Sequence, residues 1–394
     1  MHGNGVAVLD DGTSASAESG EWSGSHDDDL IPVGPESDGV GRVRESSWLD
    51  YLGEGGLVTQ ALLYCGMAND KDECLIVPEY TKAGEGIQEE IVTRRDLIFV
   101  RHGKSTWNEF QEDPRRFVYK LKFLPYSVRE GEEKRCFLDA PLCKQGMQDA
   151  RNLRDSAAEL HNTLKSEMSL NNKNVHFLSS ALSRALCTVL IGFSSLIHKK
   201  ERKVQIWSSL QEVGQGIDTH PRAAEKGSKP NIRFTRCDKE EGVEEMYENN
   251  LDVTHYDGGK IETRKNAKER MREFAAKIFD EKFEFTDEDV IVVGGHSDWF
   301  KHFFDIYLPV DECGADIQQQ RLVKAARTKK IQNGGAVRLS LEKIRRSEGA
   351  RGLPTFSYRI DPSSIQVLHK GFSEEHEKVK EKECECPYED EDHK

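Results

Sequence analysis

The pattern of hydrophobic and polar positions becomes regular from about residue 94 onward. Short apolar runs, as in buried strands, alternate there with stretches of helical periodicity. The runs predict strands at 96–100, 175–178, 204–207, 290–293, 336–341 and 356–360. The 3.6-residue periodicity predicts helices from about 105 and at 145–167, 183–197, 264–280 and 299–308. Because strands separated by helices need crossover connections, we expect an α/β fold, a three-layer αβα sandwich with a mostly parallel central sheet.

The two ends of the chain lack this pattern. Residues 1–45 are rich in Gly, Ser and acidic residues, so they cannot bury enough surface to offset the entropy of ordering, and we expect a disordered extension. Residues 46–93 hold one brief apolar patch and form a poorly defined N-terminal segment. We expect a single folded domain over 94–370, with an insertion at about 220–263. Residues 371–394 form a charged, solvated tail.

Charge and composition exclude several classes of partner. The formal net charge of -14 argues against a general nucleic-acid-binding surface, which needs a basic footprint. No apolar run approaches the roughly 20 residues that cross a bilayer, and no basic segment followed by an apolar stretch opens the chain. The nine cysteines include no CxxC pair, and the CxC at Cys384 and Cys386 lacks a second ligand pair. We therefore expect a cytoplasmic protein, with the nucleus as the alternative, that binds no membrane and no metal; the oligomeric state is open.

The first candidate site follows the strand predicted at 96–100. In an open α/β sheet, ligands lie beyond the carboxyl ends of strands, beside the next helix. Arg101 offers a planar fork of donors for phosphate oxygens, and His102 can attack phosphorus as a neutral imidazole. Gly103 lets the backbone turn and approach an anion closely. The Arg-His-Gly tripeptide alone fits a buried structural histidine equally well.

Two polar residues begin the helix that follows. Ser105 and Asn108 fall in its first turns, where backbone N–H groups and the positive end of the helix dipole favour phosphate. The order of strand, tripeptide and helix therefore favours a phosphate-binding site over a structural histidine.

Residues 97–108 (LIFVRHGKSTWN) resemble the signature of the histidine phosphatase superfamily (phosphoglycerate-mutase-like, branch 1). Lys104 stands where many members have Glu. Further segments at 139–146 (DAPLCKQG), 180–185 (SALSRA) and 294–297 (GGHS) resemble later family motifs, in the family's order. The resemblance implies the superfamily's α/β fold and a phosphohistidine chemistry.

The resemblance assigns roles to two residues outside the first motif. Arg184 would be a second clamp on the phosphate, where the alternative is a surface arginine in a helix N-terminal turn. His296 would contact the phosphoryl group and stabilise charge in the transition state, where the alternative is a structural histidine after a buried strand. The resemblance covers about residues 94–341. Cys143 stands in place of the family's usual Thr, in a segment that we interpret as structural.

The proton donor has three candidates. Residues 209–214 (SLQEVG) resemble the family's L-x-E segment, which makes Glu212 the first candidate, and Asp218 and Asp298 are alternatives. Each also fits a solvated loop carboxylate. A carboxylic acid that protonates a leaving oxygen must keep its own proton, so we expect its pKa to be raised.

The resemblance implies a phosphomonoester hydrolase of histidine acid phosphatase type that is independent of metal and needs no cofactor. Its substrate would be a small phosphomonoester or a phosphoprotein, which the sequence does not name further. A phosphoglycerate mutase is one alternative, since mutases also resemble residues 101–108, but their E-R-H-Y-G segment has no match here. A catalytically inactive phospho-ligand-binding scaffold is the other alternative, although loss of His102 or of an arginine would be expected in it.

The predicted insertion carries a group of basic residues. They are Arg222, Lys226, Lys229, Arg233 and Arg236. This group could meet a multiply charged substrate at the mouth of the site, and a solvated loop explains it equally well.

Overall fold

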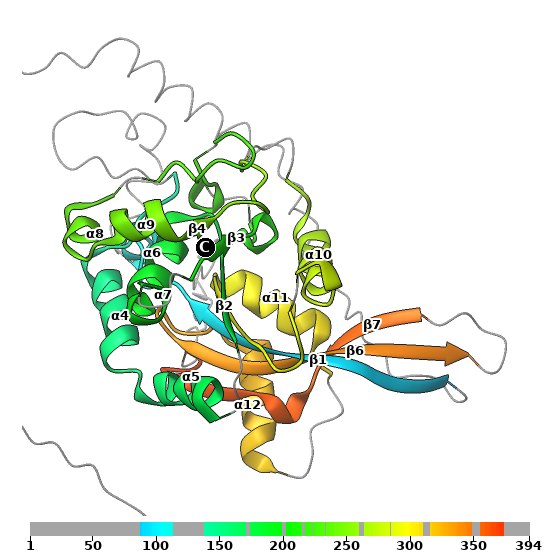
Figure 1. Cartoon of the computed structure of the whole chain (residues 1–394). Coiled ribbons are helices and arrows are strands. Elements are labelled where there is room, and N and C mark those ends of the chain that lie inside the picture. Colours follow the sequence, from blue (N-terminus) through cyan, green and yellow to red (C-terminus); the bar gives the residue numbers. More distant parts are fainter. Residues whose placement is uncertain are drawn as a thin grey trace, which may run out of the picture. The chain divides into compact units, whose positions relative to one another are not determined.

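An eight-stranded sheet forms the centre of the computed structural model (Figure 1). The structure describes residues 87–112, 138–170, 174–198, 202–214, 217–222, 224–232, 234–259, 264–283, 285–309, 316–348 and 355–373. The expectations for residues 1–45, for most of 46–93 and for the tail after 373 lie outside these ranges. The described residues all belong to one unit of the chain, Trp48–Lys394.

Every strand expected from the sequence is present. The strands are β1 (Ile87–Arg101), β2 (Val175–Ser179), β3 (Val204–Ile206), β4 (Leu251–Asp252), β5 (Val290–Gly295), β6 (Ala336–Glu348), β7 (Thr355–Ile360) and β8 (Gln366–His369). Their order is β4-β3-β2-β5-β1-β6-β7, with β8 also paired to β6. From β4 to β1 all neighbours are parallel, whereas β6 is antiparallel to β1, β7 and β8. The mostly parallel sheet is therefore confirmed.

Alternate residues of β1 point into two different cores. Leu97 and Phe99 belong to one buried cluster, and Ile98 and Val100 to the other, all with no exposed surface. The first cluster includes α10 (Ala267–Ile278), α11 (Ser297–Tyr307) and α12 (Ile317–Thr328). The second includes α4 (Lys144–Asp155), α5 (Ala158–Leu170), α6 (Ser183–Gly192), α7 (Ser194–His198) and α9 (Val243–Asn250). Helices thus cover both faces of the sheet (Figure 1), which confirms the three-layer expectation.

Two of the expected helices are each divided in the structure. The helix expected at 145–167 is α4 followed by α5, with a turn at Ser156, and the one at 183–197 is α6 followed by α7, with a turn at Phe193. The apolar face predicted for 145–167 is nevertheless buried throughout, including Leu153 and Leu160 on either side of the break. Because both pieces pack on the same core, the hydrophobic period continues across a break that it does not reveal.

The structure also extends β1 well before the predicted apolar run. Residues 87–95 pair antiparallel with residues 341–348 of β6, with a register shift between Ile91 and Thr93. Many of these side chains are charged and exposed, so the segment has no continuous apolar run for sequence reasoning to detect. In Figure 1 this part of β1, with β6 and β7, extends away from the helices.

The predicted insertion at 220–263 contributes structure of its own. It contains α8 (Arg236–Glu240), α9 and β4, and β4 adds a parallel strand beside β3. In addition, α2 (Thr106–Glu112) follows β1 as predicted, and short 3₁₀ turns lie at Ser208–Leu210 and Ile217–Thr219. Among the described helices, none is long and apolar enough to cross a membrane.

Candidate active site

The carboxyl ends of β1, β2 and β5 meet at one edge of the sheet. Arg101 of β1 lies opposite Gly295 of β5, and Ser179 of β2 lies opposite Gly294. The backbone N–H of His102 donates to the carbonyl of Gly295 at 3.1 Å, which carries the contact past the end of β1. Because parallel strands end at the same edge, the segments that follow these three strands come together there.

His102 is buried and its ring nitrogens have different partners. Nδ1 lies 2.6 Å from the carbonyl oxygen of Gly103, and a carbonyl can only accept, so Nδ1 carries the proton. Nε2 then keeps its lone pair, and Nε of Arg184 donates to it at 3.3 Å. Burial, with help from the charges of Arg184 and Arg101, lowers the pKa of His102 well below its usual value. The imidazole is therefore neutral, with its unprotonated nitrogen toward the arginine.

Arg184 lies in the first turn of α6 and is almost fully buried. Besides the bond to His102, its Nη1 donates to the carbonyl of Asp218 at 2.7 Å, and its Nη2 lies 3.5 Å from the Asp218 carboxylate. A surface arginine is thereby excluded, since the side chain is 2% exposed. Burying a guanidinium costs free energy unless it is paired, and these three contacts hold it beside the imidazole.

Two further cationic or ionisable groups face the same region. Nη1 of Arg101 donates to the carbonyl of Ile331 at 2.7 Å, while its buried Nε has no hydrogen-bond partner among the described residues. The ring of His296 lies 5.2 Å from that of His102, centroid to centroid, and both of its nitrogens are likewise unpartnered there. Burial, then the charges of Arg184 and His102, lower the pKa of His296. Buried polar atoms are normally hydrogen-bonded, so this set is suited to an anion.

Glu212 lies at the same edge and is held from two sides. Its Oε1 accepts the backbone N–H of Val213 at 2.8 Å and that of Trp299 at 3.0 Å, the latter in the first turn of α11. Burial, reinforced by the nearby charge of Asp298 and opposed by Arg184, raises the pKa of Glu212 to about 8. A carboxyl group with this pKa keeps its proton near neutral pH, as a general acid requires.

The two alternative acids differ from Glu212 in their surroundings. Asp298 is 38% exposed and forms an ion pair with Lys330 at 2.6 Å. Asp218 is buried, which raises its pKa, but its carboxylate lies beside the guanidinium of Arg184. Of the three candidates, Glu212 best combines burial with a retained proton.

Ser105 and Asn108 satisfy each other at the start of α2. The Ser105 Oγ and backbone N–H both donate to Oδ1 of Asn108, at 3.0 and 3.1 Å, and the backbone N–H of Asn108 donates back to Ser105 Oγ at 3.1 Å. This is an N-terminal capping arrangement, whereas phosphate binding had been predicted for these two residues. A direct contact of these two side chains with phosphate stays a prediction.

Gly103 allows a close approach of two backbone segments. A Cβ at this position would lie 2.4 Å from the carbonyl oxygen of Gly146, and a Cβ at Gly146 would lie 1.9 Å from the carbonyl oxygen of Lys104. No side chain fits at either position without moving the backbone. The segment expected to be structural, 139–146, thus supports the loop that carries His102.

Several positioning residues were missed as such by sequence reasoning. Asp139 accepts hydrogen bonds from the backbone N–H and the hydroxyl of Ser183, and thereby caps α6 just before Arg184. Thr188, one turn further along α6, accepts from the backbone N–H of Gly103 at 3.0 Å. A signal existed for Asp139, since it stands in the DAPLCKQG segment, but nothing local linked it to Ser183.

The backbone of the Glu212 segment is held by two arginines. Arg264 donates to the carbonyls of Glu212 and Gly214 at 3.0 and 3.1 Å, and Arg270 donates to those of Gln211 and Glu212, both at 3.3 Å. Arg270 is 3% exposed and lies on the apolar face of α10. A charged residue on an otherwise apolar helix stripe was the signal that could have identified it.

No family model matches the chain, and no curated protein matches it. Among solved structures, it is similar to an ecdysone phosphate phosphatase from Bombix mori in complex with tungstate, at 13% identity over 68% of this chain and 93% of that one, with a TM-score of 0.31. It is also similar to a mycobacterial glucosyl-3-phosphoglycerate phosphatase complexed with VO3, at 13% identity over 68% of this chain and 97% of that one, with a TM-score of 0.29. A phosphoglycerate mutase from Bacillus anthracis is similar at 16% identity over 63% of this chain and 88% of that one, with a TM-score of 0.30. At such low identities and TM-scores, the activity must be argued from the residues themselves.

Proposed function

We propose that the protein is a phosphomonoester hydrolase that forms a phosphohistidine on His102. The observation that carries the proposal is the state of the His102 imidazole, which is neutral, has its proton on Nδ1 and presents Nε2 beside Arg184. A neutral imidazole is the nucleophilic form, and a fixed guanidinium beside it would hold an oxygen of the phosphate in line. Nearby, Arg101 and His296 offer donors for the remaining oxygens.

In the first step, Nε2 of His102 attacks phosphorus. The Nε2–P bond forms while the bond from phosphorus to the ester oxygen breaks, and the leaving oxygen takes the proton of Glu212. The raised pKa of Glu212 supports this role, because the carboxyl group still carries its proton near neutral pH. Arg101 and Arg184 neutralise the charge that develops on the phosphoryl oxygens.

In the second step, water releases the phosphoryl group. Glu212, now a carboxylate, takes a proton from water while the water oxygen bonds to phosphorus and the Nε2–P bond breaks. The products are inorganic phosphate, neutral His102 and protonated Glu212, so the cycle closes. The chemistry uses the arginines and histidines for charge stabilisation.

The test is to trap the intermediate. The purified 394-residue chain is mixed with phosphorus-labelled p-nitrophenyl phosphate at mildly acidic pH and quenched within milliseconds. We expect label on the protein that is stable to base, labile to acid and absent from His102→Ala. His161→Ala is the matched control, since His161 lies on α5, away from the strand ends, and its Nε2 bonds to the carbonyl of Leu153.

Different outcomes separate the alternatives. Turnover retained by His102→Ala would overturn the proposal. Conversion of 3-phosphoglycerate to 2-phosphoglycerate without net release of phosphate would instead identify a mutase, and phosphate binding without any turnover would identify a scaffold. A panel of phosphorylated metabolites, assayed on wild type and on His102→Ala, then identifies the substrate.

A further inference from the structure

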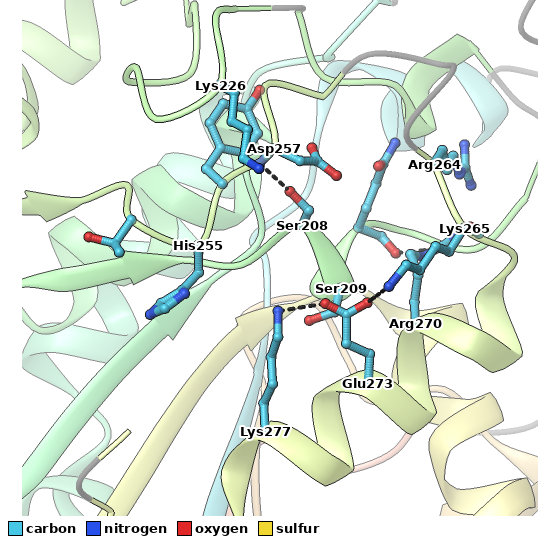
Figure 2. Close-up of a pocket in the computed structure, with 13 residues that line it drawn as sticks. Ser208, Ser209, Lys226, His255, Asp257, Arg264, Lys265, Arg270, Glu273 and Lys277 are labelled. Carbon is cyan, nitrogen blue, oxygen red and sulfur yellow. Dashed lines mark hydrogen bonds and ion pairs between the residues drawn. The ribbon is translucent and has the colours of Figure 1, made fainter. Parts of the chain in front are cut away.

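A polar cavity of about 380 Å³ lies beside the Glu212 segment, between α10 and the loop after β4 (Figure 2). Its wall includes Ser208, Ser209 and Gln211 on one side and five residues of 264–277 on the other. None of His102, Arg184 and His296 lines it. The cavity is therefore separate from the candidate catalytic groups, and its volume is in the range of sites for small molecules.

The cavity has a surplus of positive charge. Its cationic side chains are Lys226, Arg264, Lys265, Arg270 and Lys277, and its carboxylates are Asp257 and Glu273. Five cations against two carboxylates leave a surplus of three positive charges, in a protein whose formal net charge is -14. Cations gathered in a concave site raise the local concentration of anions.

The charged groups come from different walls. Lys265 and Lys277 share the single carboxylate of Glu273, at 2.7 and 2.5 Å, and Figure 2 shows the two ammonium groups on either side of it. Lys226 approaches from the opposite wall, in the predicted insertion. Lysine ammonium groups act as point charges. Ammonium groups on several walls can each meet a different oxygen of a tetrahedral phosphate, whereas a planar carboxylate ligand would suit them less well.

The two arginines of the cavity also contact the segment that carries Glu212. Arg264 and Arg270 donate to main-chain carbonyls of residues 211, 212 and 214, while the Glu212 carboxyl group accepts from the start of α11. Burial, with Arg270 nearby, lowers the pKa of Arg264 to about 8, so an anion in the cavity would favour its charged form. Occupancy of the cavity and the position of Glu212 therefore depend on the same two guanidinium groups.

We propose that this cavity is a second anion site, which binds a small phosphate monoester as an effector and acts on turnover through Arg264, Arg270 and the Glu212 backbone. The binding part stands by itself, whereas the effect on turnover rests on the proposed function. The bound phosphate would draw on the ammonium groups of Lys226, Lys265 and Lys277. It would also pull the two arginines away from the carbonyls that fix the Glu212 segment.

Binding is tested without any need for activity, by calorimetric titration of inorganic phosphate into the 394-residue chain. We expect two sites per chain in wild type, of which one is weakened about five- to tenfold by Lys226→Glu. Glu273→Gln removes the carboxylate that competes for Lys265 and Lys277, so it should tighten the same site by a similar factor. Two sites unchanged by both substitutions, or one site in all proteins, would overturn the proposal.

Matched controls separate a local effect from a change in net charge. Lys239→Glu and Glu288→Gln make the same charge changes at exposed positions that do not line the cavity. We expect both to bind phosphate as wild type does. If Lys239→Glu weakens binding as much as Lys226→Glu, the effect is general electrostatics and the cavity is not the site.

The effect on turnover is tested by phosphate inhibition of p-nitrophenyl phosphate hydrolysis. Phosphate at His102 competes with substrate and raises only KM, whereas phosphate in the cavity should change kcat. We expect mixed inhibition in wild type, purely competitive inhibition in Lys226→Glu and a stronger kcat effect in Glu273→Gln.

Purely competitive inhibition in wild type would overturn the coupling. A rise in KM alone in Lys226→Glu would instead place the cavity on the substrate path and overturn the effector role. If no protein hydrolyses the ester, the proposed function fails while the titration still reports on the cavity.

Discussion

The two halves of β1 differ in the exposure of their charged side chains. In the outer half, residues 87–95, Glu90 and Arg345 form an ion pair in which both side chains are exposed. Arg94 and Glu342 form a second pair at 2.8 Å, in which Arg94 is exposed and Glu342 is buried. In the inner half, residues 97–100 are fully buried, the strand ends at Arg101, and His102 follows it.

The difference shows what each kind of charge can do. Exposed pairs across strands are screened by water and contribute little free energy, so they are suited to solubility and to the register of the strands. Beyond the inner half, Arg184 and the carboxyl group of Glu212 are buried at one edge of the sheet beside two buried histidines, at the cost of desolvation, and such an arrangement is typical of a functional site.

The largest effect should come from His102, the proposed nucleophile. We expect His102→Ala to lower kcat for p-nitrophenyl phosphate by roughly 10⁴- to 10⁶-fold, since the covalent route is lost. The melting temperature, measured by calorimetry, should stay close to that of wild type because the substitution removes a buried polar ring. A loss of less than tenfold would show that the inner end of β1 is not catalytic.

The second arginine should give the next effect. Arg184→Lys keeps the positive charge but loses the planar fork that contacts His102 and Asp218, and we expect kcat/KM to fall roughly 10²- to 10³-fold. The control is Arg154→Lys, an arginine on α4 that pairs with Asp155 and Glu241 at the surface. Steady-state kinetics on both proteins should show the loss only for Arg184→Lys; equal losses would contradict the special role of the buried guanidinium.

Glu212 links both activity and stability to pH, and both should fall as the pH rises. Its folded pKa of about 8 lies above the usual 4.5, so kcat/KM should fall about tenfold per pH unit above 8, as the acid loses its proton. The same shift gives stability that is complete below pH 4.5 and is lost as pH rises through 8. At pH 8, Glu212→Gln should therefore melt roughly 3–6 °C higher than wild type, and turn over about 10²- to 10³-fold more slowly.

Calorimetry and pH–rate profiles check these two outcomes, with Asp298→Asn as the control. Asp298 is the partly exposed alternative acid, and its charge helps to raise the pKa of Glu212, so its substitution should keep the alkaline limb and move it to lower pH. An alkaline limb that disappears in Asp298→Asn and persists in Glu212→Gln would reassign the acid.

A smaller effect on stability should come from the loop after β1. Gly103→Ala places a methyl group 2.4 Å from the carbonyl oxygen of Gly146, and we expect a loss of about 1–3 kcal/mol in the free energy of unfolding. Val92→Ala in the outer half, where the side chain is 47% exposed, is the comparison and should cost less than about 1 kcal/mol. Urea denaturation of both proteins measures the difference, and equal losses would show that the two halves are packed alike.

The smallest effect should come from the outer ion pairs. We expect Arg345→Ala to change the free energy of unfolding by about 0–1 kcal/mol, because its pair with Glu90 is exposed. Its activity should stay within twofold of wild type. A large loss of activity would show that the outer half of β1 contributes to the site, and would break the contrast between the two halves.

The sequence predicted the strands and the sheet type because buried parallel strands have continuous apolar runs. It missed the outer half of β1, where most of residues 88–95 are exposed and four of them are charged, so no such run exists. It also did not anticipate the division of the helix at 145–167, since α4 and α5 keep one apolar face. Local hydrophobic pattern reports which face is buried, and it does not report where a hydrogen-bonded helix stops.

For the candidate site, the sequence indicated the residue types and the strand ends that carry them. His102, Arg184 and His296 were each expected after a strand, and the structure places His102 against both of the others. Their catalytic roles stay a proposal. The capping of α2 by Ser105 and Asn108 was not expected, because a capping pair and a phosphate-binding pair use the same residue types at the same place.

By itself, the sequence determined an α/β sandwich with a cluster of phosphate-type residues at the ends of its parallel strands. Strand and helix periods, and the short segments around His102, Arg184 and His296, are local properties that the order of residues contains. Only the tertiary structure decided that Glu212 is buried against α11 with a raised pKa, and that Arg264 and Arg270 join its backbone to a second cationic cavity. Burial and charge proximity arise between residues far apart in the chain, so they exist only after the chain has folded.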